Sequence, residues 1–305
     1  MLPRHIIKGN PRPPPLCLRS RSFKAAGVCI GLLILAQLSV SLLLYSVYSA
    51  LPFISQGWVH RNVVARFTGL RYASQNGQDL YLHNRFFRGR TRPGVFVEFG
   101  MSDGVTNSNT YFFETQLAWR GLCVEPVLAD FEHATAARPG CHVVRAAVSP
   151  ACLTPSVDIS IPASLGRAAI ATEGEQQKGK KGWSTETVAC TTLQALLEQT
   201  GFRHIQLVSI DTEGTELAIM TAFPWHDFVI DVVQVEVITT TPGLLDAMTR
   251  FMQGVGYDLD VVLDVTSSLH TVDVVFERTE RADLLRPLFA RSVATPPPPS
   301  PTNSH

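Results

Sequence analysis

The chain has 305 residues, of which 45% are hydrophobic and 17% charged, and its formal net charge is zero. This length permits one large domain with extensions, and the composition is that of a globular protein shifted slightly toward apolar residues. The sequence contains no basic patch, so nothing in it favours a nucleic-acid partner.

The apolar shift has a local origin near the N-terminus. Residues 25–51 contain no charged side chain, and Gln37 is their one strongly polar interruption. A run of 27 residues is long enough to cross a bilayer with some tilt, so we predict a transmembrane signal-anchor helix. A cleavable signal peptide is the alternative, but its apolar region is about 7–15 residues long.

Charge on either side of this segment predicts its orientation. Residues 1–24 carry six basic side chains and no acidic one, which is typical of a cytosolic tail. The sequence therefore predicts a single-pass type II protein of the Golgi or endoplasmic reticulum, with its main domain in the lumen. Four cysteines fall in that part, and three full pairings are open. Cys123 lies in an apolar strand and is expected to be a buried thiol.

The rest of the chain divides into a short stem, one domain and a tail. We assign the stem to residues 52–71, the domain to 72–290, and a disordered proline-rich tail to 291–305. Apolar runs predict strands, in chain order, at 94–100, 121–125, 142–148, 205–210, 228–237, 257–265 and 271–277. Helices are expected at 108–119, 130–137, 191–199, 215–223 and 243–252, and residues 150–190 are expected to be irregular.

This alternation predicts the fold class. Continuous apolar strands that alternate with helices are typical of a mostly parallel sheet covered by helices on both faces. The last two strands follow each other closely, as in a hairpin, and this predicts one antiparallel strand at the sheet edge.

Ligands of such sheets bind at the carboxyl ends of the strands, and three strand ends carry suitable residues. Gly100 and Gly104 follow the first strand, where a glycine allows a tight turn and a close approach to a ligand. Glu125 ends the second strand, 21 residues after Gly104, where an acid commonly accepts the ribose hydroxyls of a nucleotide. Asp211 and Glu213 end the fourth strand, although acids there also favour the first turn of a helix.

At these positions the chain resembles a known family. The stretches SQNGQDLYLHNRFF, GVFVEFGMSDGVTNSNTYFFE, WRGLCVEP, CTTLQALL and LVSIDTEGTELAIM resemble the FkbM-type S-adenosylmethionine-dependent methyltransferases. The resemblance extends from about Tyr72 to Arg278, and its most specific part is Asp-x-Glu-Gly-x-Glu. It implies a class I methyltransferase fold, which is Rossmann-like and has a seven-stranded sheet. Met101 departs from the small residue that the family often has there.

The resemblance also implies a cofactor site. S-adenosylmethionine is expected to lie on the first-strand loop with its methionine part and on the second-strand acid with its ribose. The expected cofactor-binding residues are Glu98, Gly100, Asp103, Gly104, Ser108, Asn109 and Glu125.

Asp211 then lies beside the methyl group, where three roles are open. It can take the proton of the acceptor hydroxyl or orient that hydroxyl, it can hold Mg²⁺ or Ca²⁺ together with Glu213, or it can cap the following helix. Glu236, at the end of the fifth strand, is expected to line the acceptor site, and His226 is an alternative base. The sequence does not establish whether a metal is bound.

The predicted function is that of a membrane-anchored O-methyltransferase acting on a hydroxyl of a glycan or a related small-molecule acceptor. A nucleotide-dependent oxidoreductase is a second hypothesis, although the chain lacks the Gly-x-Gly-x-x-Gly fingerprint. A catalytically inactive, membrane-anchored binding module is the third. The sequence identifies neither the acceptor nor the oligomeric state.

Overall fold

The computed structural model describes residue 37 and residues 69–162, 169–170, 182–263 and 270–283. The chain divides into two units, Met1–Phe53 and Ile54–His305. In the first unit only Gln37 is described, and it is helical. The rest of the predicted span at 25–51, nearly all of the stem and the whole tail lie outside the described residues. Within the described ranges, no helix has both the length and the apolar character needed to cross a membrane.

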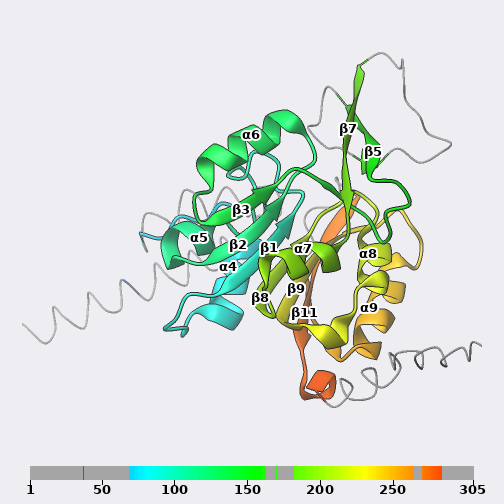
Figure 1. Ribbon diagram of the computed structural model, residues 1–305. Helices are drawn as coiled ribbons and strands as arrows, with labels where there is room; N and C mark the ends of the chain where they lie inside the picture. Colours follow the sequence, from blue (N-terminus) through cyan, green and yellow to red (C-terminus); the bar gives the residue numbers. More distant parts are fainter. Residues whose placement is uncertain (1–36, 38–68, 163–168, 171–181, 264–269, 284–305) are drawn as a thin grey trace, which may run out of the picture. The chain divides into compact units, whose positions relative to one another are not determined.

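The second unit is built on a seven-stranded sheet with the order β10-β11-β9-β8-β1-β2-β3 (Figure 1). All neighbouring strands from β9 to β3 are parallel, whereas β11 is antiparallel to both β9 and β10. The strands are β1 (Val95–Phe99), β2 (Arg120–Val124), β3 (Cys141–Val144), β8 (His204–Ile210), β9 (Val229–Ile238), β10 (Tyr257–Leu263) and β11 (Thr271–Arg278).

This arrangement confirms the seven-stranded, mostly parallel sheet, with one correction. The antiparallel strand is not at the edge, because β11 inserts between β9 and β10. The hairpin of β10 and β11 is present as predicted, but its second strand pairs on both sides. Sequence proximity predicts that two strands pair, but it does not determine which of them also pairs with the rest of the sheet.

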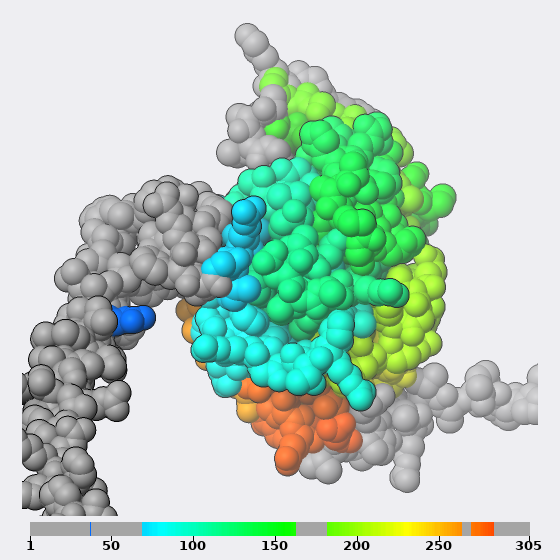
Figure 2. All heavy atoms as spheres, turned by 90° about the vertical axis from the view of Figure 1, so that its left-hand side faces the viewer, coloured from blue at the N-terminus to red at the C-terminus, as the bar shows by residue number. Residues whose placement is uncertain are grey.

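Side chains alternate between the two faces of the sheet, and each face packs against its own helices. One core contains residues of α7 (Leu193–Thr200), α8 (Glu216–Ala222) and α9 (Leu244–Gly254). The other contains residues of α4 (Gln78–Leu82), η2 (His83–Phe87), α5 (Tyr111–Leu117) and α6 (Leu128–Ala137). The atoms coloured cyan to green in Figure 2 cover this second side of the molecule.

Residues 150–190, which we expected to be irregular, instead contribute to a second sheet. Its order is β4-β7-β5-β6, formed by β4 (Ala147–Val148), β5 (Ser156–Pro162), β6 (Ala169–Ile170) and β7 (Trp183–Thr191). The predicted strand at 142–148 is accordingly split into β3 and β4. Figure 1 shows β5 and β7 rising together beside the main sheet. The polar composition of this region reflects an exposed hairpin, with several side chains of β7 at least partly exposed.

The four cysteines of this unit form two disulfides. Cys123 of β2 is bonded to Cys141 of β3, and Cys152 is bonded to Cys190 of β7. The expectation that Cys123 is a free buried thiol is therefore wrong. The residue is fully buried, but β3 lies directly beside β2 and brings Cys141 within bonding distance.

Candidate active site

A cavity of about 310 Å³ opens at the carboxyl ends of the central strands. Its lining residues come mainly from the segments that follow β1, β2 and β8, from near the end of β9 and from the beginning of β11. Its lining residues are Gln75, Gln78, Glu98, Phe99, Gly100, Met101, Ser102, Asp103, Thr106, Asn107, Asn109, Val124, Glu125, Pro126, Ala146, Ala147, Val148, Ile159, Asp211, Thr212, Glu213, Glu236 and Asp273. This is the edge at which the sequence placed a ligand site, and the volume is at the lower end of the range for small-molecule sites.

The lining is strongly acidic. Among the described residues that line the cavity, every ionisable side chain is a carboxylate: Glu98, Asp103, Glu125, Asp211, Glu213, Glu236 and Asp273. Its two ends differ, because apolar residues from β2, β4 and β5 gather near Glu125 while most acids gather near β8, β9 and β11. The acidic end therefore suits cations and hydroxyl donors, and the apolar end suits a flat apolar ring.

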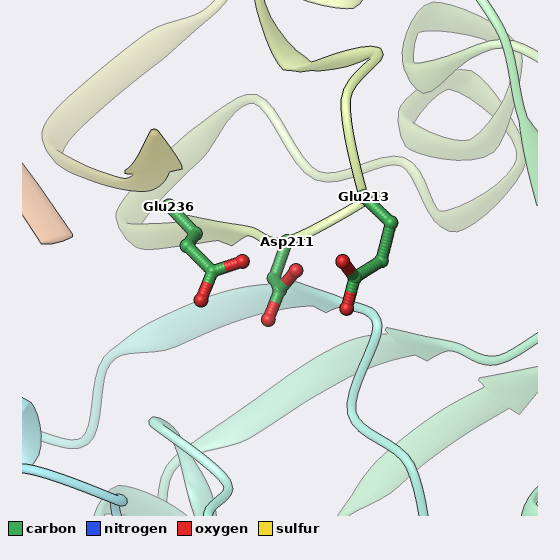
Figure 3. A group of neighbouring side chains, drawn as sticks. All are labelled: Asp211, Glu213 and Glu236. Atoms are coloured by element: carbon green, nitrogen blue, oxygen red, sulfur yellow. The ribbon is translucent and has the colours of Figure 1, made fainter. Parts of the chain in front are cut away.

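Three acids from two neighbouring strands converge at the acidic end. Asp211 and Glu213 follow β8 and Glu236 lies near the end of β9, and one carboxylate oxygen of each lies within 4.8 Å of the other two. Figure 3 shows the Asp211 side chain between the two glutamates, with the three carboxylates turned to the same side. The structure thus brings together the three acids that the sequence proposed for catalysis.

The environment of Asp211 increases its affinity for a proton. Burial, followed by the negative charges of Glu236 and Glu213, raises the pKa of Asp211 well above its usual range. Its Oδ1 atom is buried and has no hydrogen-bond partner among the described residues. A buried oxygen without a donor is costly, so it is available to accept a hydrogen bond from a water molecule or a ligand in the cavity.

Glu216, the last acid of the motif, has a structural role instead. Its Oε1 accepts hydrogen bonds from the Thr212 and Gly214 backbone N–H groups, both at 2.9 Å, and from the Thr212 hydroxyl at 3.1 Å. The acids after β8 therefore divide into two groups. Glu216 fixes the turn that begins α8, and Asp211 and Glu213 face the cavity.

Strained backbone is concentrated at the same cavity. Five non-glycine residues of the described chain have positive φ, and Ser102, Asn107 and Glu213 are three of them, at 51°, 65° and 56°. All three line the cavity. Such conformations cost free energy and persist where the surrounding structure enforces them, which is common at ligand sites.

Glu125 lies at the boundary between the acidic and the apolar end. Its Oε2 accepts the Ser102 N–H at 3.0 Å and its Oε1 accepts the Val127 N–H at 2.9 Å. Each carboxylate oxygen can accept two hydrogen bonds, so both retain capacity for a pair of vicinal hydroxyls. Burial raises the pKa of Glu125 to about 7, although the Val127 hydrogen bond opposes this rise.

The two glycines after β1 adopt the turn that the sequence predicted, with φ of 72° at Gly100 and 79° at Gly104. Their close neighbours are protein atoms, however. A Cβ at Gly100 would lie 1.9 Å from the Asp211 carbonyl oxygen, and one at Gly104 would lie 2.9 Å from Cβ of Ala134 in α6. Gly100 lines the cavity and Gly104 does not. Gly104 therefore allows close packing against α6, and its assignment to the cofactor site stays a prediction.

Glu98 and Ser108 are buried and support the loop after β1. Glu98 accepts hydrogen bonds from the Ser108 and Thr110 hydroxyls and from the Asn109 N–H, at 2.6–3.0 Å. It also pairs with the fully buried guanidinium of Arg138 at 3.2 Å. Ser108 does not line the cavity, whereas Asn109 does, and the buried Oδ1 of Asn109 has no partner among the described residues.

Sequence reasoning missed Arg138. It is one residue beyond α6, and it joins Glu98 to Glu114 of α5 and to the Gly104 carbonyl. A single arginine at the end of a helix is ordinarily exposed, so no local pattern distinguishes it.

Asp103 stabilises its own loop while it faces the cavity. Its Oδ1 accepts the N–H groups of Val105 and Thr106 at 2.9 and 2.7 Å. Burial opposes ionisation, but these hydrogen bonds prevail and lower the pKa of Asp103.

Asp273 of β11 is a further acid that the sequence did not indicate. It is the register partner of Glu236, and it is buried beside the acidic cluster. Gln78 of α4 and Gln234 of β9 donate to its two oxygens at 2.6 and 2.9 Å. Burial raises the pKa of Asp273 to about 6. Only the antiparallel insertion of β11 brings this residue to the cavity.

His226 does not reach this cavity. It lies in η3 (Trp225–Asp227), before the start of β9, and lines a separate cavity of about 240 Å³ with Trp225 and Tyr257. Glu236 is at the other end of β9, roughly 20 Å away at the rise of a strand. The structure therefore separates His226 from the acids with which the sequence grouped it.

The family model described as methyltransferase FkbM domain matches residues 98–259, which is 162 of the 305 residues. Among curated proteins, none matches the chain. The match contains Glu125 and the Asp211 motif, and its description agrees with a seven-stranded class I methyltransferase-like fold.

Several solved structures are similar in fold at low identity. A TehB-like SAM-dependent methyltransferase from Corynebacterium glutamicum is 10% identical, with a TM-score of 0.38, over 74% of this chain and 98% of that chain. A human methyltransferase 10 domain containing protein is 11% identical, with a TM-score of 0.42, over 77% and 97%. A precorrin-6y C5,15-methyltransferase from Geobacter metallireducens is 11% identical, with a TM-score of 0.38, over 70% and 93%. The family assignment rests on the family model and not on these likenesses.

Proposed function

The chain belongs to the FkbM methyltransferase family, and we propose that it transfers a methyl group from S-adenosylmethionine to a hydroxyl of a glycan or a related acceptor. The transfer of a methyl group from S-adenosylmethionine follows from the family. The oxygen acceptor, its glycan nature and the membrane anchor are the proposed parts.

The residues of the cavity fit the cofactor. Glu125 retains acceptor capacity on both oxygens for the two ribose hydroxyls, and the neighbouring apolar end suits the adenine ring. Asp211 lies two strands from Glu125, about 10 Å away at the usual spacing of strands. The acidic lining is complementary to the positive charges of the sulfonium and the ammonium group.

The observation that carries the proposal is the position of Asp211. Bound S-adenosylmethionine supplies an electrophilic methyl carbon, and an attacking hydroxyl must lose its proton. The unpartnered Oδ1 of Asp211 is an acceptor for that proton at the acidic end of the cavity. A raised pKa means a higher affinity for a proton, so this carboxylate is a stronger base than an ordinary aspartate. Glu213 and Glu236 hold the acceptor by its neighbouring hydroxyls.

The experiment is the transfer of a labelled methyl group by the full-length chain to a panel of glycans and small polyols. Transfer that releases S-adenosylhomocysteine supports the proposal. Labelling of amines alone would contradict the oxygen acceptor. Acceptor binding without turnover would favour an inactive binding module, and stabilisation by a nicotinamide dinucleotide alone would favour an oxidoreductase.

A divalent cation at the acidic cluster is a second way to activate the hydroxyl. The observation that favours it is the close approach of the three carboxylates, which are suitable ligands for Mg²⁺ or Ca²⁺. A bound ion would acidify the hydroxyl, and Asp211 would then act as a ligand. Activity that disappears in a chelator and returns with Mg²⁺, Mn²⁺ or Ca²⁺ would establish this route. Full activity in the presence of a chelator would contradict the metal route and support Asp211 as the general base.

The proposed location is the lumen of the Golgi or endoplasmic reticulum, with residues 25–51 as the anchor. The uncharged run and the six preceding basic residues support this topology. The two disulfides of the second unit also support it, because disulfides persist in oxidising compartments.

A further inference from the structure

The strands β5 and β7 lie outside the main sheet, yet β5 contributes one residue to the apolar end of the cavity. Ile159 of β5 is 1% exposed and lines the cavity together with Ala147 and Val148 of β4. It belongs to a small separate core with Val127 and Val188. Of the two strands, β5 therefore reaches the site through Ile159, and β7 supports β5 by pairing with it from Ser156 to Pro162.

The same strands hold the segment that follows Glu125. Glu186 of β7 accepts the N–H of Leu128, the first residue of α6, at 3.0 Å and pairs with Arg145 at 2.7 Å. Arg145 in turn donates from Nε to the Pro126 carbonyl at 3.2 Å. Residues 126–128 are thus fixed from the outside by β7, while the Val127 N–H orients the Glu125 carboxylate from the inside.

A disulfide anchors the base of the strand pair. Cys190 of β7 is the register partner of Ala147 in β4, and it is bonded to Cys152, which precedes β5. The bond therefore ties both strands close to the part of β4 that lines the cavity. Without it, the position of β5 would depend on its pairing with β7, the small apolar core and the Glu186 contacts.

We infer that the β5–β7 strand pair forms the adenosine end of the cofactor site, with Ile159 packed against the nucleobase and Glu186 positioning Glu125 through Arg145 and residues 126–128. The inference rests on the proposed cofactor site and assigns its apolar end. The ribose hydroxyls meet Glu125 and the reactive methyl lies toward Asp211, so the base must extend the other way. In that direction the lining residues are apolar: Val124, Pro126, Ala146, Ala147, Val148 and Ile159.

The test uses two ligands that share this end of the cofactor. S-adenosylhomocysteine spans the whole site, whereas 5′-methylthioadenosine keeps the adenosine and lacks the amino-acid part. Ile159→Ala removes the contact with the adenine base. The affinity for both ligands should therefore fall by the same factor, about 5–30-fold. Glu186→Gln weakens the contacts to Leu128 and Arg145, so the affinity for both ligands should fall by about 3–10-fold. For both variants KM for S-adenosylmethionine should rise while kcat at saturation stays within about twofold, since these residues touch no reacting atom.

Val157→Ala is the matched control. Val157 faces the same way as Ile159, two residues earlier on β5, and packs against the same small core, but it does not line the cavity. A loss of ligand affinity that comes only from a loosened strand pair would appear in both variants. The inference requires the loss in Ile159→Ala and near wild-type affinity in Val157→Ala, at comparable melting temperatures.

The outcomes separate this inference from the proposed function. A wild-type protein that binds neither ligand would overturn both. A wild-type protein that binds both ligands, with Ile159→Ala and Glu186→Gln binding them equally well, would overturn only the role of the strand pair. If Ile159→Ala fails to fold, Glu186→Gln decides alone, because unchanged affinity for 5′-methylthioadenosine in that variant contradicts the inference.

Discussion

Replacing Asp211 by asparagine should make the protein more stable and nearly inactive. The side chains have the same shape, and the buried Oδ1 of Asp211 has no hydrogen-bond partner among the described residues that the change would remove. What the change does remove is a negative charge that lies between Glu213 and Glu236. A residue that served only to cap α8 would give the opposite result, a loss of stability with an intact rate.

The magnitude follows from the geometry of the cluster. Two like charges 4.8 Å apart repel by about 3.5 kcal/mol at an effective dielectric constant of about 20. Partial exposure, salt and proton uptake by the cluster reduce the net gain to about 1–3 kcal/mol. For a domain of this size each kcal/mol corresponds to a rise of roughly 2–4 °C in Tm.

The stability that Asp211→Asn gains over the wild type should increase as the pH rises. Folding raises the pKa of Asp211, so the folded state binds more protons than the unfolded chain in the window between the two pKa values. Wild-type stability therefore falls as pH rises through that window, and the variant does not show this fall. The advantage of Asp211→Asn should be absent at acidic pH and complete above the raised pKa.

The assay combines melting curves from pH 4 to 8 in chelator with methyl transfer by the same preparations. Turnover should fall by about 10²–10⁴-fold while affinity for S-adenosylhomocysteine is kept. Glu216→Ala is the control of opposite sign, since it deletes the acceptor of three hydrogen bonds and should lower stability by about 1–3 kcal/mol. An Asp211→Asn protein that melts earlier than wild type at neutral pH, yet methylates at the wild-type rate, would refute the reasoning.

Four further predictions concern cofactor, loop, disulfide and topology. Glu125→Ala should weaken the binding of S-adenosylhomocysteine by roughly 1.5–3 kcal/mol, as measured by calorimetry. The affinity of the wild-type protein should rise with pH through about 7, as the Glu125 carboxyl ionises. Equal affinity in the variant and the wild type would place the ribose elsewhere. Gly100→Ala should abolish cofactor binding and lower Tm, because its Cβ would overlap the backbone of the neighbouring strand end. Joint replacement of Cys152 and Cys190 by serine should lower the affinity for 5′-methylthioadenosine by a larger factor than it changes kcat. A tag after His305 should survive protease on intact microsomes, and its digestion there would place the domain in the cytosol.

The sequence by itself determined the features that arise within one strand or one turn. Short apolar runs bounded by turn residues and rich in Val and Ile are typical of buried strands, because their side chains must leave water. The strand ends at Gly100, Glu125 and Asp211 follow directly, since parallel strands place their carboxyl ends at one edge. The Asp-x-Glu-Gly-x-Glu motif and its surroundings were sufficient to indicate the family.

Tertiary structure decided which of these residues meet. Asp273 joins Glu236 only because β11 inserts antiparallel between β9 and β10. His226 lies away from the acidic cluster because it precedes β9, whereas Glu236 lies near the other end of that strand. The partner of Cys123 depended on the neighbour of β2, which a single chain segment does not specify.

The roles of similar residues were also decided in three dimensions. Glu213 and Glu216 are three residues apart and chemically alike, yet one faces the cavity and the other holds the turn. Gly100 and Gly104 both have positive φ, but only Gly100 lines the cavity, because α6 packs against Gly104. Local sequence sets the conformations that a residue can adopt, whereas its chemical role depends on the neighbours that distant strands and helices place around it.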